Sequence, residues 1–137
     1  MSLDVAHALD RYLTTFATRD PAAIADLHSP GSIFWLRLNE RPAVGRPAVE
    51  QEFAALFSQY RDLTFEVRNT RLGATFWVLD WVLNFQVADR RIGFDCLDVV
   101  DLDRHGSVAR KNTWIDLAQA QARAGTVTDS GNRRPRP

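Results

Sequence analysis

The second half of the chain is a series of long segments in which apolar and polar residues alternate. Four such segments cover residues 63–72, 75–88, 91–103 and 107–117, and short turns separate them. Alternation of this length predicts extended strands with one buried face, and short turns predict that neighbouring strands pair antiparallel. We therefore expect the second half to form one antiparallel sheet.

The first half shows helical periodicity instead. Residues 3–18 place apolar side chains three and four positions apart, Asp20-Pro21 starts a short second helix that stops at Ser29-Pro30-Gly31, and Pro47 opens a third helix. Residues 32–38 read as a strand. Helices followed by strands predict the α+β class, in which a curved antiparallel sheet wraps around three N-terminal helices and leaves a cavity between them.

The length and composition of the chain fit a single globular domain. Of its 137 residues, 45% are hydrophobic and 25% are charged, which suffices for a core with a polar surface. We expect residues 1–124 to form the domain, with a short helix at 117–124. Residues 125–137 lack apolar periodicity and are expected to form a disordered tail.

Charge and cysteine usage argue against several classes of protein. The formal net charge is zero, so the broad basic field of a nucleic-acid-binding protein is missing. No segment is long and apolar enough to span a membrane, and the single cysteine, Cys96, fits a reducing cytoplasmic setting. The histidines, His7, His28 and His105, lack metal-ligand spacing, so neither a metal nor a cofactor is expected. We expect His28 at a helix end and the other two at the surface.

Asp98 is a carboxylate on the apolar face of its predicted strand. Side chains two positions apart share a face, so Asp98 lies beside Cys96 and Val100. A lone carboxylate on such a face is costly unless another group pairs with it. The sequence therefore predicts a partner for Asp98 on a neighbouring strand.

Tight turns in the two last hairpins would identify that partner. With such turns Phe85 faces Phe94, and Asp98 faces Lys111 on one side and Trp81 on the other. Lys111 is the only lysine among 17 basic residues. Because the pKa of a buried lysine is tunable whereas arginine stays charged, lysine at this position is informative.

Three interpretations of this pair remain open at this point. It is a buried ion pair that only holds the strands together, or a tuned acid–base pair in a pocket, or an artefact of a wrong register. The side chains expected to line the pocket are mostly aromatic or aliphatic, which suits a flat apolar ligand, although they could also simply fill the core. They are Trp35, Phe53, Phe57, Leu79, Trp81, Leu83, Phe94, Cys96 and Thr113.

The order of these segments resembles a known superfamily. With Ala8–Asp20 (ALDRYLTTFATRD), Gly45–Val49 (GRPAV) and Asp101–Asp116 (DLDRHGSVARKNTWID), residues 5–118 resemble the nuclear-transport-factor-2-like superfamily, and within it SnoaL-like polyketide cyclases and ketosteroid isomerase. The resemblance implies a cone-shaped sheet around helices, an apolar pocket inside, and dimers formed through the outer face of the sheet.

Two positions match the functional residues of ketosteroid isomerase. Tyr12 falls on its oxyanion-hole tyrosine and Asp98 on its oxyanion-hole aspartic acid. The general base of that enzyme is missing, because Leu36 and Arg37 occupy the region where it should lie. Lys111 beside Asp98 also favours an ionised carboxylate, which cannot donate a hydrogen bond. We therefore do not expect ordinary steroid isomerisation.

The sequence leaves three functions open. The first is a cofactor-free enzyme that isomerises or cyclises an apolar cyclic or polyketide-like carbonyl compound by proton transfer. In it Asp98 is the base, Lys111 is either the tuner of that base or the group that stabilises the enolate, and Tyr12 is a donor. The others are a non-catalytic protein that binds such a small molecule, and a dimeric interaction module. A homodimer is expected in each case, because apolar residues gather on the outer face of the predicted sheet, namely Val78, Val82, Leu97, Val99 and Trp114.

Overall fold

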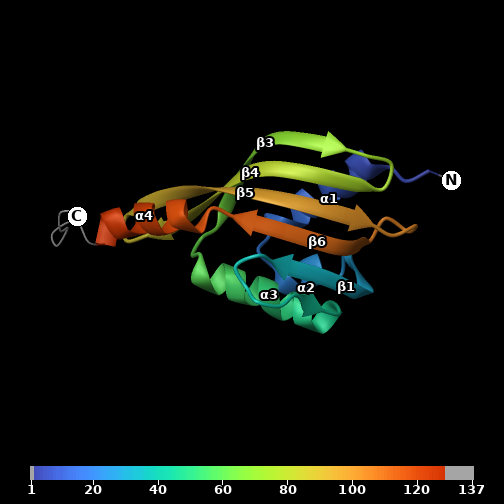
Figure 1. Ribbon diagram of the computed structural model, residues 1–137, viewed down its shortest axis with the longest axis horizontal. Helices are drawn as coiled ribbons and strands as arrows, with labels where there is room; N and C mark the ends of the chain where they lie inside the picture. The colour runs from blue at the N-terminus through green and yellow to red at the C-terminus, as the bar shows by residue number, and fades with distance from the viewer. Residues whose placement is uncertain (1, 129–137) are drawn as a thin grey trace.

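The computed structural model describes residues 2–128, which form a curved sheet of six strands packed against helices (Figure 1). The strand order is β2-β1-β6-β5-β4-β3, so the sheet keeps two edges and does not close. The predicted α+β class is confirmed. The elements, in chain order, are α1 (Val5–Phe16), α2 (Pro21–Ala25), β1 (His28–Leu36), β2 (Ala43–Val44), α3 (Arg46–Gln59), β3 (Thr64–Leu72), β4 (Phe76–Val87), β5 (Arg90–Leu102), β6 (Val108–Ile115) and α4 (Leu117–Thr128).

The first two helices begin at aspartate caps. The Asp4 carboxylate accepts a hydrogen bond from the backbone N–H of His7, and Asp20 accepts from the first turn of α2, where Pro21 occupies the first helical position. The buried side chains of α1 recur at helical spacing, so one face of the helix packs on the sheet and carries Tyr12 inward.

The first strand differs from its prediction. β1 begins at His28 rather than at residue 32, it pairs with the short strand β2, and it runs parallel to β6. The sheet is therefore mixed, not purely antiparallel as predicted. Pro30 and Gly31 look like a turn in the sequence, but they lie where the β1–β6 register shifts, and such irregularities accommodate both residue types.

Both predicted hairpin registers are wrong by two residues. Phe85 pairs with Ile92 rather than Phe94, because Ala88 takes a positive φ of 53° and closes a two-residue turn one position earlier than expected. Asp98 pairs with Thr113 rather than Lys111, because the second turn is longer and the β5–β6 register shifts by one more residue between Asp101 and Leu102. In that turn Asp103 accepts from the backbone N–H groups of His105 and Ser107.

A shift of two residues leaves every side chain on its predicted face. The inner faces of β4, β5 and β6 therefore remain apolar and form one core with α1, α2 and α3. The exception among the predicted pocket residues is Trp35, which is only partly buried and lies on the outer face, whereas its neighbours Phe34 and Leu36 are buried. Trp35 was assigned to the wrong face because the predicted strand had no partner to fix its phase.

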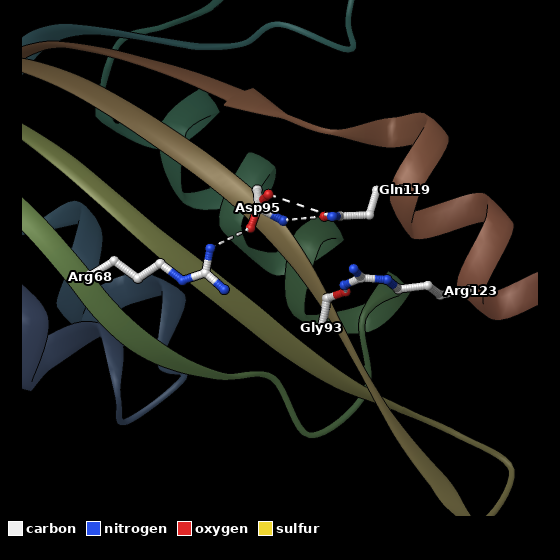
Figure 2. A network of polar contacts seen from close by, with 5 residues as sticks. All are labelled: Arg68, Gly93, Asp95, Gln119 and Arg123. Carbon is white, nitrogen blue, oxygen red and sulfur yellow. Dashed lines mark hydrogen bonds and ion pairs between the residues drawn. The ribbon is translucent and has the colours of Figure 1, made fainter.

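Helix α4 covers the edge of β5 that β6 leaves unpaired. β6 pairs with β5 only from Cys96 onward, so the backbone of residues 93–95 needs other partners. The Gln119 side chain accepts from the Asp95 N–H at 2.7 Å, and Arg123 donates to the Gly93 carbonyl (Figure 2). α4 extends to Thr128, beyond the predicted helix at 117–124, and the rest of the predicted tail, 129–137, lies outside the described residues.

Candidate functional site

Asp98 and Lys111 form a buried ion pair inside the sheet. The Lys111 Nζ lies 2.5 Å from Asp98 Oδ2, and the two residues are 2% and 1% exposed. The predicted contact is confirmed, although the register makes the two residues diagonal neighbours rather than direct partners.

Neutral groups occupy the rest of the pair's surroundings. Thr113 Oγ1 donates to Asp98 Oδ1 at 2.7 Å, so both carboxylate oxygens have partners. The Lys111 Nζ lies 5.3 Å from the ring centroid of Tyr12 and 5.7 Å from that of Trp81. These contacts enclose a charged pair that is paired, hydrogen-bonded and shielded from water.

The interior beside this pair is filled. The inner cavity measures about 10 Å³, which is the space of about one water molecule. Five of the predicted ligand-binding residues line it, and Phe57, Leu79 and Phe94 also belong to the core or pack against it. A ligand-binding role of these residues therefore stays a prediction. The five are Phe53, Trp81, Leu83, Cys96 and Thr113.

Tyr12 belongs to a second buried polar group. Its hydroxyl lies 2.9 Å from His28 Nε2, and His28 Nδ1 lies 2.9 Å from Ser32 Oγ. Both His28 and Ser32 are fully buried. Burial, followed by the positive charges of Lys111 and Arg46, lowers the pKa of His28 from 6.5 to about 3, so its ring is neutral at pH 7.

Sequence reasoning missed His28 and Ser32 because it assigned His28 to a helix end. The available signal was the alternation of β1, which places Ser32 on the inner face with Phe34. Burial, with the charge of Asp98 second, raises the pKa of Tyr12 well above its usual range. The phenol therefore keeps its proton and can act as a hydrogen-bond donor.

A cavity lies at one end of the sheet, where α1 begins and the β5–β6 hairpin turns. This mouth pocket has a volume of about 310 Å³, within the range of small-ligand sites. Tyr12 is one of its lining residues, whereas His28 and Ser32 lie behind Tyr12 and do not line it. The other lining residues are apolar Leu3, Ala8, Leu27, Trp77, Leu102 and Val108, and polar or small Ser2, Asp4, His7, Arg11, Arg104, His105 and Gly106.

A family model described as the SnoaL-like domain matches residues 9–111 of this chain. The chain belongs to the SnoaL-like domain family. No curated protein sequence matches it. Solved structures with ketosteroid isomerase-like and SnoaL-like folds align over most of its length, at identities that establish the fold alone.

Three solved structures illustrate this fold similarity. A protein assigned as a SnoaL-like polyketide cyclase from Shewanella putrefaciens aligns at a TM-score of 0.78 and 11% identity, over 90% of this chain and 87% of that chain. A ketosteroid isomerase-like protein from Catenulispora acidiphila, solved with trimethylamine, aligns at 0.76 and 9% identity, over 91% and 95%. SalBIII, an epoxide hydrolase/cyclase-like enzyme of pyran ring formation in salinomycin, aligns at 0.72 and 14% identity, over 84% and 92%.

The end of β1, where the isomerase base would lie, carries no acid in this SnoaL-like chain. Leu36 is buried, and Arg37 points to the outer face, where its guanidinium carbon lies 3.8 Å from the Trp35 ring centroid. Arg37 also donates two hydrogen bonds to Asn112 Oδ1 and lies over Trp114. The missing base is thus a feature of the structure as well as of the sequence.

Residues 2–128 contain neither a cluster of metal ligands nor a membrane-spanning helix. No three histidine, cysteine, aspartate or glutamate side chains of this part of the chain come together as a metal site. None of its helices is long and apolar enough to cross a membrane.

Proposed function

We propose that this SnoaL-like protein is a cofactor-free enzyme that binds a small apolar carbonyl compound in the mouth pocket and moves a proton on it, as in an isomerisation or cyclisation. The observation that carries the proposal is the position of Tyr12, a protonated phenol that lines the mouth pocket and is hydrogen-bonded to neutral His28. Two of the fold neighbours, one assigned as a SnoaL-like polyketide cyclase and one described as an epoxide hydrolase/cyclase-like enzyme, support this class of chemistry.

Tyr12 would hydrogen-bond the carbonyl oxygen of the substrate. A neutral imidazole has one N–H, so if Ser32 donates to Nδ1 of His28, the Nε2–H donates to the Tyr12 oxygen. The Tyr12 proton is then free for the ligand. Such a donor stabilises the negative charge that develops on the oxygen when an adjacent C–H is deprotonated.

We assign the acceptance of that proton to His7. It lies on the same helix as Tyr12 and also lines the mouth pocket. In the proposed step the C–H bond breaks, its proton moves to the imidazole, and its electron pair enters the carbonyl to give an enol(ate) hydrogen-bonded to Tyr12. Return of the proton to a different carbon completes an isomerisation.

In this proposal Asp98 and Lys111 support Tyr12 rather than take the proton. Both oxygens of Asp98 already have partners, and the adjacent cavity admits about one water molecule. The negative charge of Asp98 helps to keep Tyr12 protonated. Their roles as base and tuner, predicted from the sequence, are tested in the same assay.

A second candidate is binding without turnover. The mouth pocket has one carboxylate among its lining residues, Asp4, and it caps α1 rather than facing a free position. His7 is also exposed, and an exposed base competes with water for the substrate proton. These observations favour a protein that binds or shields a carbonyl compound.

Hydrogen–deuterium exchange distinguishes the two candidates without knowledge of the product. A panel of cyclic ketones, enones and β-diketones, including 2-tetralone, is incubated with the protein in D₂O, and exchange of the α-protons is followed by NMR. We expect faster exchange with the wild-type protein, and a loss of about 10²-fold or more in Tyr12→Phe and in His7→Gln. Tyr60→Phe, a buried tyrosine away from the pocket, should leave the rate unchanged.

Other outcomes are equally clear. Saturable binding without exchange would support the binding candidate, and neither binding nor exchange across the panel would contradict the proposal. If Tyr12→Phe kept full activity and the stable double variant Asp98→Asn/Lys111→Met lost it, the catalytic groups would be Asp98 and Lys111 rather than Tyr12.

A further inference from the structure

A second concave site lies at the opposite end of the sheet from the mouth pocket. Between the β4–β5 hairpin and α4, a pocket of about 240 Å³ is lined by Arg90, Arg91, Ile92, Gly93 and Arg123. Three of these five residues are arginines and none is acidic. We call it the arginine pocket.

Arg91 is fixed in this pocket by neutral acceptors. Its guanidinium donates to the carbonyl oxygens of Asp62 at 2.6 Å and Asn84 at 3.1 Å, and to the side-chain oxygens of Thr64 and Gln86. These bonds hold the group in place without cancelling its charge. The positive charge therefore remains available to a ligand.

The charges of Arg123 and Arg90 are likewise uncompensated. Arg123 donates to the backbone carbonyl of Gly93. Asp95, the carboxylate drawn in Figure 2, is instead paired with Arg68 at 3.2 Å and contacts Gln119. Arg90 makes no side-chain hydrogen bond or ion pair with any residue in the described range 2–128. Three like charges in one concavity repel each other unless an anion binds between them.

We propose that the arginine pocket binds the phosphate group of a small soluble molecule. The planar guanidinium presents paired N–H donors that match phosphate oxygens, and several arginines around one dianion use this geometry better than lysines would. The site is a discrete concavity on a chain of zero net charge. A chain without net positive charge is a poor match for a nucleic acid or an anionic membrane.

This site is independent of the proposed function. Strand β5 has 13 residues, and the arginine pocket lies at its first residues whereas the mouth pocket includes its last. At about 3.3 Å per residue the strand between the two sites is roughly 40 Å long. Failure of one proposal therefore leaves the other unaffected.

Isothermal titration with pyrophosphate and with inorganic phosphate, at constant ionic strength set with chloride, tests the proposal. We expect saturable one-to-one binding that weakens by about 10-fold or more in Arg90→Gln and in Arg123→Gln. Arg90→Lys should weaken anion binding less, because lysine keeps the positive charge and lacks only the paired N–H donors of the guanidinium. Arg71→Gln removes the same charge from an exposed position on β3 and should have no effect.

Several results would overturn the proposal. They are no saturable binding of either anion, equal weakening in Arg71→Gln, and unchanged binding in both Arg90→Gln and Arg123→Gln. Arg90→Gln keeps the test valid even if loss of the Gly93 contact loosens α4 in Arg123→Gln. Vesicles containing phosphatidic acid form a further arm, because binding to vesicles without binding to pyrophosphate would indicate a membrane surface instead.

Discussion

Breaking the Asp98–Lys111 pair one partner at a time should destabilise the protein far more than removing both. Asp98→Asn leaves the Lys111 ammonium buried without its carboxylate, among the rings of Tyr12, Phe34 and Trp81. Lys111→Met leaves a buried carboxylate whose remaining strong donor is a neutral hydroxyl. Each single change should cost about 3–5 kcal/mol, the usual penalty for an uncompensated buried charge.

The double variant Asp98→Asn/Lys111→Met should be close to the wild-type protein in stability. The new amide keeps an acceptor for the Thr113 hydroxyl, and the methionine suits the aromatic surroundings. Replacing a buried pair with neutral groups of similar volume is often neutral or stabilising. We therefore expect the two single effects to be non-additive by about 3 kcal/mol or more.

Urea unfolding of the four proteins at pH 7, followed by circular dichroism, measures this coupling. The exposed pair of Arg68 and Asp95, with side chains 57% and 48% exposed, provides the matched control cycle. Arg68→Gln and Asp95→Asn should couple by about 0.2–1 kcal/mol at most. Additive effects at Asp98 and Lys111, or single losses below about 1 kcal/mol, would refute the description of a desolvated pair.

Three further predictions follow from the structure. The pKa of His28 falls from 6.5 to about 3 on folding, so the contribution of neutral His28 to the free energy of unfolding is complete above about pH 6.5 and is lost as the pH falls towards 3. Between these pH values His28→Gln should reduce the slope of stability against pH by about 1.4 kcal/mol per pH unit. His105→Gln, in an exposed turn, should leave the slope unchanged. The homodimer predicted from the sequence remains a proposal, and its interface should include Leu97 and Trp114, which are 40% and 42% exposed on the outer face. Sedimentation equilibrium should show a dimer for the wild-type protein and a monomer for Leu97→Arg. A monomeric wild-type protein would contradict the proposal. A β,γ-unsaturated ketosteroid should not be rapidly converted, because Leu36 lies where a base is required, and rapid spectrophotometric conversion would contradict this assignment.

The faces of the strands could be predicted from the sequence, but the exact pairing could not. Alternation placed Asp98, Lys111 and Thr113 on one buried face, and this assignment survives a register shift of two residues. The shift itself depends on turn geometry. A positive φ at Ala88 is uncommon for a residue other than glycine, so nothing in the local sequence indicated it.

The parallel pairing of β1 with β6 also could not be predicted from local sequence patterns. It joins residues far apart in the chain, such as Phe34 and Lys111, and depends on how the intervening helix and hairpins fold back. Without that partner the phase of the strand was free, and Trp35 was assigned to the interior.

The free volume inside the domain could not be inferred from the sequence. Sequence patterns indicated which side chains face inward, including Phe53, Leu83 and Cys96, but not whether they leave space between them. Close packing closes the interior to about 10 Å³, whereas about 310 Å³ remains at the open end beside Tyr12. Free volume depends on the fit of all side chains at once, which no single sequence pattern encodes.

The most direct test of Tyr12 as the hydrogen-bond donor to the ligand is the affinity of the protein for 2-naphthol, a planar analogue of the enol of 2-tetralone. Isothermal titration should show binding by the wild-type protein and by Tyr60→Phe, and binding at least about 10-fold weaker in Tyr12→Phe, because the naphthol oxygen loses its donor. Naphthalene, which has no oxygen, should bind the three proteins equally. Equal affinity of the wild-type protein and Tyr12→Phe for 2-naphthol, or no binding by the wild-type protein, would contradict the assignment of Tyr12 as the group that meets the ligand.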